Sequence, residues 1–165
     1  MRVRVPDLLI LAVGNPSRGD DALGPLFLER LGEWRERGGD WEGVELLTDF
    51  QLQIEHAVDL EGRTLALFVD ASVSCPPPYQ FARLGPARDT SYTSHALSPA
   101  AVLHVYEQIN RAPSPPAFSL AIRGERFELG EPLSPAAQTN LAAALEFAGR
   151  LLARRDVERW ARIVG

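Results

Sequence analysis

Lysine is absent from this chain of 165 residues, and all 17 basic residues are arginine. Three chemistries that need a lysine side chain are therefore excluded: a Schiff base, a serine–lysine dyad and the lysine of a phosphate-binding P-loop. The formal net charge is -5, and the longest basic run is the pair Arg154–Arg155. Because nucleic-acid-binding proteins usually carry a clustered basic face, we predict that nucleic acid is not a partner.

Cysteine and long apolar runs are scarce. The single cysteine, Cys75, has no partner for a disulfide within the chain, and a zinc site built on paired cysteines is excluded. The longest apolar runs fall far short of the ~20 residues that cross a bilayer. The first residues lead directly into a strand-like run and lack the features of a signal peptide. We therefore expect a cytoplasmic protein that has no membrane partner.

The remaining composition is that of an ordinary globular protein. Hydrophobic residues make up 45% of the chain and charged residues 24%. The length suits a single domain spanning 1–165, and no linker divides it. Continuous apolar runs predict strands that are buried on both faces, as in a parallel sheet. The predicted strands are 7–13, 44–48, 64–70 and 118–122, with a further edge strand at 79–84.

Between the strands, apolar residues recur at helical spacing. One helix is expected to begin at Asp20 or Asp21, and another to follow Asp49 as its cap. Ser98 and Ser134, each followed by proline, predict the starts of two more helices. This alternation predicts an α/β fold: a three-layer α/β/α sandwich on a mostly parallel, twisted sheet of about five strands.

In such sheets, ligands bind outside the carboxyl ends of the strands, where the strand order reverses. Asp20 and Asp21 follow the first predicted strand, Asp70 ends the third, and His95 precedes the Ser98 helix. Two carboxylates and an imidazole suit a divalent metal such as Zn²⁺ or Ni²⁺. Without a cation, two close carboxylates would repel each other and raise each other's pKa.

Each of these residues also has a structural interpretation. Asp20 or Asp21 can cap the first helix, Asp70 can be an ordinary turn acid, and His95 can be a surface histidine. His56 and His104 fall in predicted helices and are expected to be structural or surface residues. The segment 14–19 lacks the spacing of a dinucleotide-binding loop, and no nucleophile elbow surrounds the serines near His95.

The segment from Gly14 to Gly24, Gly-Asn-Pro-Ser-Arg-Gly-Asp-Asp-Ala-Leu-Gly, resembles the signature G-N-x-x-x-x-D-[DE]-x-x-G of the hydrogenase maturation proteases. The strand-end Asp70 and the Ser94–His95 pair before a helix match further positions of that family. The resemblance extends from Leu8 to about Leu152. Two departures are Ala22, where glycine is frequent, and the segment 48–53, where many members carry an Asp-Gly-Gly turn.

The resemblance implies a hydrolase of the peptidase class, described as an aspartyl-type endopeptidase. Members of the family remove the C-terminal extension of a [NiFe]-hydrogenase large-subunit precursor after nickel has been inserted. The family's catalytic and metal-recognising residues fall on Asp21, Asp70 and His95, while the role of Asp20 is less settled. The implied metal is nickel supplied by the substrate, and no organic cofactor is expected. The implied partner is the hydrogenase large-subunit precursor.

Two other functions remain open from the residues alone. A protein of the same fold could bind the precursor as a nickel-dependent checkpoint or chaperone without cutting it. A nucleotide-binding, doubly wound domain is the other alternative, although the missing lysine and the glycine spacing count against it.

Overall fold

The computed structural model of the protein describes residues 5–88 and 97–164. Its centre is a five-stranded sheet with the order β2-β1-β3-β5-β4. The strands β2, β1, β3 and β5 are parallel, and β4 pairs with β5 in the antiparallel direction at one edge. The strands are β1 (Leu8–Val13), β2 (Val44–Asp49), β3 (Leu65–Ser72), β4 (Tyr79–Leu84) and β5 (Ala117–Arg123).

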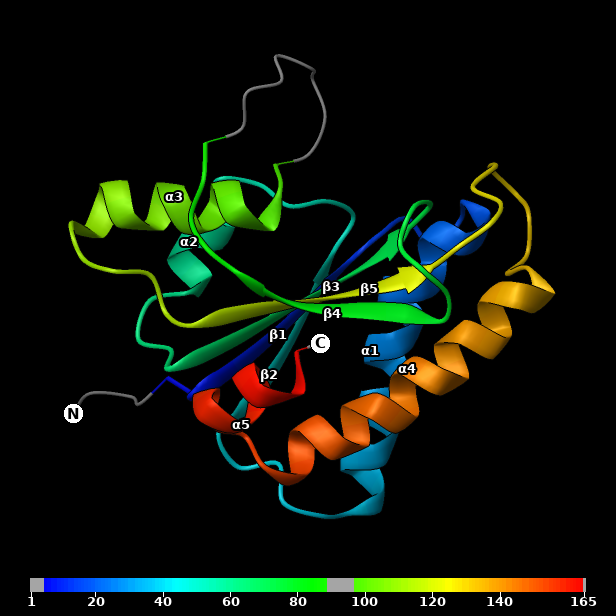
Figure 1. Ribbon diagram of the computed structural model, residues 1–165. Helices are drawn as coiled ribbons and strands as arrows, with labels where there is room; N and C mark the ends of the chain where they lie inside the picture. Colours follow the sequence, from blue (N-terminus) through cyan, green and yellow to red (C-terminus); the bar gives the residue numbers. More distant parts are fainter. Residues whose placement is uncertain (1–4, 89–96, 165) are drawn as a thin grey trace.

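Helices cover both faces of this sheet (Figure 1). One face is packed by α1 (Leu23–Arg37), α4 (Pro135–Ala153) and α5 (Val157–Ile163). The other is packed by α2 (His56–Asp59) and α3 (Pro99–Asn110). The predicted α/β/α sandwich on a mostly parallel sheet is therefore confirmed.

The sequence signals for the central strands and two helices act as expected. All six residues of β1 are buried, which explains its unbroken apolar run. The Ser98 and Ser134 hydroxyls accept hydrogen bonds from the N–H groups of Ala101 and Ala137, at 3.1 and 3.2 Å, and so cap α3 and α4.

Two local predictions were wrong, and one short helix was not predicted. Asp49 is the last residue of β2 and not a helix cap, and the helix predicted after it is the single turn α2. Neither Asp20 nor Asp21 caps α1; both lie in a short 3-10 helix, η1 (Gly19–Ala22), that precedes it. The helix that was not predicted is α5, whose Trp160 is completely buried and packs edge-on against Phe81 and Phe118.

The two faces of the sheet are covered unequally. Phe118, Leu120 and Ile122 of β5 point toward α1, α4 and α5 and have no exposed surface. The alternate residues of the same strand, Ser119 and Ala121, keep partly exposed surface on the α3 side. Among the described residues, the single turn α2 and the helix α3 pack there, and they leave the β5 end of this face partly exposed.

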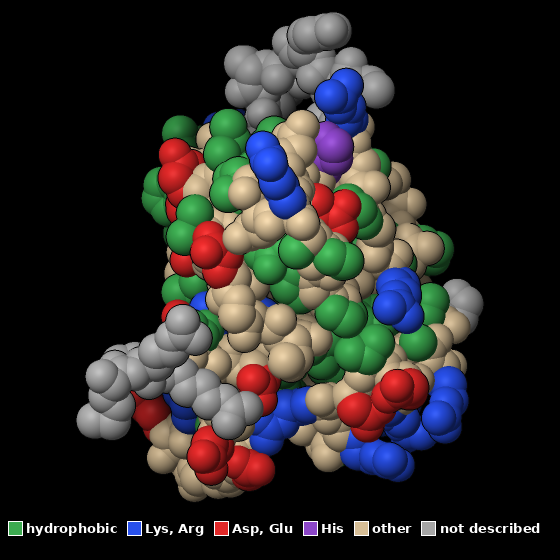
Figure 2. Space-filling model, turned by 90° about the vertical axis from the view of Figure 1, so that its left-hand side faces the viewer, with side chains coloured by type: hydrophobic (Ala, Val, Ile, Leu, Met, Phe, Trp, Pro, Cys, Tyr) green, Lys and Arg blue, Asp and Glu red, His purple; other side chains and the backbone are tan. Residues whose placement is uncertain are grey.

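Within 5–88 and 97–164, no helix is long and apolar enough to cross a membrane. On the side shown in Figure 2, several arginine side chains lie singly, and those in the lower part lie beside acidic side chains. That nucleic acid is not a partner stays a prediction.

Candidate functional site

The carboxyl ends of β1 and β3 meet where the order of the sheet reverses. Strand β1 is hydrogen-bonded to β2 on one side and to β3 on the other, so the chain leaves these strands in opposite directions. Ligands of doubly wound sheets bind at such a point. The segment 14–22 follows β1 there, and Asp70 lies in β3, two residues before the strand ends.

Two glycines allow the segment after β1 to pack closely. A Cβ atom on Gly14 would lie 2.0 Å from the carbonyl oxygen of Asp21, and Gly14 has a φ of +149°. A Cβ atom on Gly24 would lie 2.2 Å from the carbonyl oxygen of Val13, so the start of α1 rests directly on the end of β1. These contacts explain both ends of the glycine-bounded motif.

Asp21 is held by the turn that this packing creates. The Asn15 N–H donates to the Asp21 Oδ2 atom at 2.7 Å, and the Asn15 side chain accepts from the Ser17 N–H at 2.9 Å. The Asp21 side chain is partly exposed and lines a cavity. The hydrogen bond to Asn15 fixes one carboxylate oxygen and so orients the group.

Asp20, its neighbour, points away into the protein and has no exposed surface. Its two carboxylate oxygens accept from the backbone N–H groups of Glu125, Arg126 and Ser134 and from the Ser134 hydroxyl, at 2.6 to 3.1 Å. Burial raises the pKa of Asp20, but these hydrogen bonds outweigh it and hold the pKa below its usual value. The structure thus gives Asp20 a structural role, tying the motif to the segment between β5 and α4.

Asp70 is an unusual carboxyl group. Its pKa is raised to about 7: burial of the carboxyl is the largest cause, the charge of Asp21 also raises it, and the hydrogen bond that the Ala71 N–H donates to Oδ1 lowers it. Although the residue keeps exposed surface, apolar side chains such as Leu11, Leu52 and Phe68 line the pocket beside it. A carboxyl group with this pKa changes its charge near neutral pH.

One cavity brings Asp21 and Asp70 together. It has a volume of about 370 Å³ and lies between the loop after β1, the loop after β2 and the start of α3. The charge of Asp21 contributes to the raised pKa of Asp70, as expected of two carboxylates that line one cavity. The lining residues are Val13, Gly14, Asp21, Phe50, Gln51, Leu52, Asp70, Leu97, Ser98 and Pro99.

His95, the third predicted site residue, lies outside the described residues, whereas Leu97 and Ser98, just after it in the chain, line the cavity. Within 5–88 and 97–164, no group of three His, Cys, Asp or Glu side chains is arranged to hold a metal ion. The three-residue metal site therefore stays a prediction.

The loop after β2 supplies one wall of the cavity. The imidazole of His56 closes this loop: its Nε2 atom lies 3.3 Å from Asp49 Oδ2, and its Nδ1 atom accepts from the Gln53 N–H at 2.8 Å. Phe50, Gln51 and Leu52 lie between these residues. His56 is buried and structural, as expected, and His104 is partly exposed on α3.

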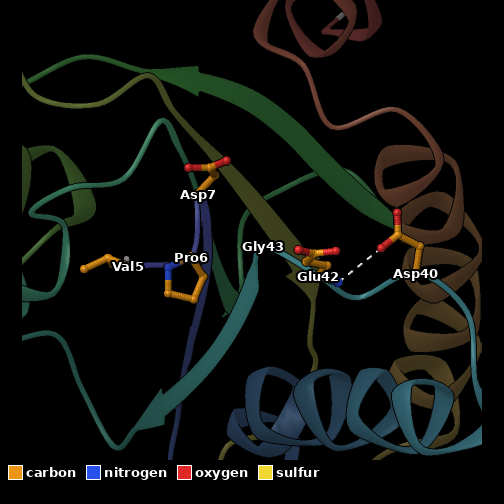
Figure 3. A pocket seen from close by; sticks show the side chains of 6 residues that line it. All are labelled: Val5, Pro6, Asp7, Asp40, Glu42 and Gly43. Carbon is orange, nitrogen blue, oxygen red and sulfur yellow. Dashed lines mark hydrogen bonds between the residues drawn. The ribbon is translucent and has the colours of Figure 1, made fainter. Parts of the chain in front are cut away.

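A separate cavity of about 430 Å³ lies near the amino ends of β1 and β2 (Figure 3). Asp7, Asp40 and Glu42 line it. The Glu42 N–H donates to Asp40 Oδ1 at 3.2 Å, and Arg155 lies 3.3 Å from Asp40 Oδ2. The ion pair with Arg155 balances the charge of Asp40. This cavity lies at the amino ends of the strands, opposite to the carboxyl ends where Asp21 and Asp70 lie.

Together these features define a class: an α/β/α protein with two carboxylates facing one cavity at the switch point of its sheet. No model of a known protein family matches the chain, and no curated protein matches its sequence. Solved structures match it over most of its length, and they include [NiFe] hydrogenase maturation proteases. The resemblance that the sequence motif indicates is thereby confirmed for the fold.

Two of these structures show the extent of the likeness. The [NiFe] hydrogenase maturation protease HycI from Thermococcus kodakarensis KOD1 has a TM-score of 0.68 at 21% identity, covering 90% of this chain and 94% of that one. The hydrogenase maturating endopeptidase HybD from E. coli has a TM-score of 0.64 at 22% identity, covering 88% of this chain and 92% of that one.

Proposed function

We propose that this protein is an endopeptidase that removes the C-terminal extension of a [NiFe]-hydrogenase large-subunit precursor after nickel insertion. The observation that carries the proposal is the shared cavity of Asp21 and Asp70, which lies at the switch point of a fold also found in hydrogenase maturation proteases. The glycine-bounded motif that positions Asp21 is the segment with the family signature.

The charge of the site supports recognition of a cation carried by the substrate. Asp21 and Asp70 repel each other, and burial further disfavours the ionised form of Asp70. A divalent ion between the carboxylates would offset both costs and let both be ionised. In this proposal the substrate's nickel binds Asp21, Asp70 and His95, and a precursor without nickel lacks the ion that joins it to the site.

Docking of the nickel centre places the peptide bond at the edge of the sheet. The ion either polarises the carbonyl of that bond or activates a water molecule. Water adds to the carbonyl carbon, the C–N bond breaks, and the departing amine takes up a proton. The mechanism requires no serine or cysteine nucleophile.

The test is a two-component assay with nickel-loaded and nickel-free forms of the same purified precursor. Mass spectrometry is expected to show loss of the C-terminal tail only from the nickel-loaded form. Equal cleavage of both forms would contradict nickel recognition while leaving the peptidase activity intact. Binding of the loaded precursor without loss of the tail would instead support a checkpoint or chaperone.

A further inference from the structure

An apolar pocket of about 240 Å³ opens on the α3 side of the sheet. Phe68 of β3 and Ser119 and Ala121 of β5 form its floor. Leu52, Leu84 and Pro99 come from three other segments and also line it. Asp70 is the charged side chain among its described lining residues.

The pocket follows from the unequal coverage of the sheet. Ser119 and Ala121 have small side chains, and they face the side on which, of the described helices, α2 and α3 are packed. The opposite side of β5 carries Phe118, Leu120 and Ile122, all fully buried. The space beside α3 is therefore bounded by small residues on a rigid central strand, which suits a binding pocket.

This apolar pocket is continuous with the candidate site. Val13, Leu52, Asp70 and Pro99 line both cavities. In the sheet, Asp70 is paired with Ala121, and Phe68 is paired with Ser119. Because residues on one face of a strand recur about 6–7 Å apart, Ser119 lies one step deeper than Asp70 along the pocket floor.

We propose that the apolar pocket binds an apolar side chain of the substrate at a residue next to the scissile bond, and that it thereby selects the substrate. This inference rests on the proposed peptidase function. A polypeptide that places its scissile bond at Asp21 and Asp70 has its neighbouring residues within about 4 Å of that bond along the chain. An apolar side chain gains by leaving water in such a pocket, whereas a charged one would lose its hydration.

The proposal predicts a preference that can be measured as kcat/KM. The substrate is the nickel-loaded precursor, in which each residue flanking the scissile bond is changed in turn to Leu, Ala or Asp. At one of these positions we expect wild-type protein to prefer Leu over Ala by roughly 10- to 100-fold, as is typical of apolar specificity pockets.

Ser119→Leu tests the pocket because the added side chain fills its floor while Asp21 and Asp70 remain. With this variant we expect kcat/KM to fall about 10-fold or more for the Leu substrate and to change less than about threefold for the Ala substrate. The matched control is Ala82→Leu. Ala82 pairs with Ser119 on β4 and is partly exposed, but it does not line the pocket.

The outcomes separate the pocket from the proposed function. If Ser119→Leu keeps the wild-type ratio between the Leu and Ala substrates, or Ala82→Leu changes it equally, the pocket does not select the substrate. If wild-type protein cleaves no loaded precursor, the peptidase proposal fails. In that case peptides spanning the site, with Leu or Asp at the flanking position, are titrated by NMR. Binding of the Leu peptide that Ser119→Leu abolishes supports the pocket, and binding unchanged by the substitution overturns it.

Discussion

Asp20 and Ser134 are 114 positions apart in the chain, yet two hydrogen bonds join them directly. The Asp20 carboxylate accepts from the Ser134 N–H at 2.7 Å and from its hydroxyl at 2.6 Å. The same hydroxyl oxygen caps α4 by accepting from the Ala137 N–H. One buried carboxylate therefore connects the motif after β1 to the start of the longest helix.

Asp20→Asn is expected to destabilise the fold. The amide loses the charge that strengthens four hydrogen bonds, and its NH₂ group faces donors, so the loss should be about 3 kcal/mol. Urea unfolding at pH 7 measures it. The control is Asp40→Asn, whose side chain is 80% exposed and whose ion pair with Arg155 should contribute less than about 1 kcal/mol. Equal stability of the two variants would refute a structural role for Asp20.

Gly24→Ala should be costly because the new Cβ atom would lie 2.2 Å from the Val13 carbonyl oxygen. We expect a loss of about 3 kcal/mol or more, since β1 and α1 would have to move apart. Gly32 in the same helix offers the matched control, as a Cβ atom there meets nothing within 4 Å. Gly32→Ala should gain up to about 1 kcal/mol from helix propensity. Thermal unfolding of both variants measures the difference, and a tolerated Gly24→Ala would show that the close contact is not needed.

Asp21→Asn should separate activity from stability. The variant keeps an oxygen that can accept from the Asn15 N–H, but it removes one of the two charges facing the cavity. Cleavage of the nickel-loaded precursor is expected to fall about 100-fold or more, with stability unchanged or slightly higher because the repulsion of Asp70 is relieved. His95→Ala should lose activity similarly. Wild-type cleavage rates in either variant would remove that residue from the site.

The pKa of Asp70 makes stability depend on pH in a defined direction. In the folded protein the group keeps its proton up to about pH 7, whereas its ordinary pKa is 3.8. The folded state therefore binds more protons between these values, and the contribution of Asp70 to stability falls as pH rises from about 4 to 7. Since Asp70 keeps exposed surface, we expect a change on the order of 1–2 kcal/mol, smaller than the full shift implies.

Asp70→Asn supplies the comparison for this pH dependence. The amide does not titrate, so the loss of stability from pH 4 to 7 should be smaller in the variant than in the wild type. Urea unfolding at four pH values across this range gives both slopes. Parallel slopes would show that the folded-state pKa of Asp70 is close to its ordinary value.

The features that could be predicted from the sequence are those that depend on residues close together in the chain. Unbroken apolar runs gave the buried strands, and Ser98–Pro99 and Ser134–Pro135 gave the starts of α3 and α4, because burial pattern and capping are local properties. The edge position predicted for the strand 79–84 is confirmed by the place of β4 at the end of the sheet. The approach of Asp21 and Asp70 to one cavity was accessible because carboxyl ends of parallel strands share an edge.

The features that could not be predicted from the sequence depend on residues far apart in the chain. Asp20 matches a helix cap by residue type, but its acceptor capacity is taken by groups more than 100 positions away. Asp49 also matches a cap, yet its carboxylate bonds to the Phe50 N–H and lies beside His56. The helix α5 was missed because it has only seven residues and a single fully buried side chain, Trp160.

The unequal packing on the two faces of the sheet divides the effects of mutation between them. Substitutions that change side-chain volume beneath α1, α4 and α5 alter a closely packed interior, so they should lower the stability of the fold. Changes at Ser119 or Ala82, on the open end of the other face, meet less resistance from neighbours. New substrate preferences could therefore be selected on one side of the strands while the opposite side keeps the molecule folded.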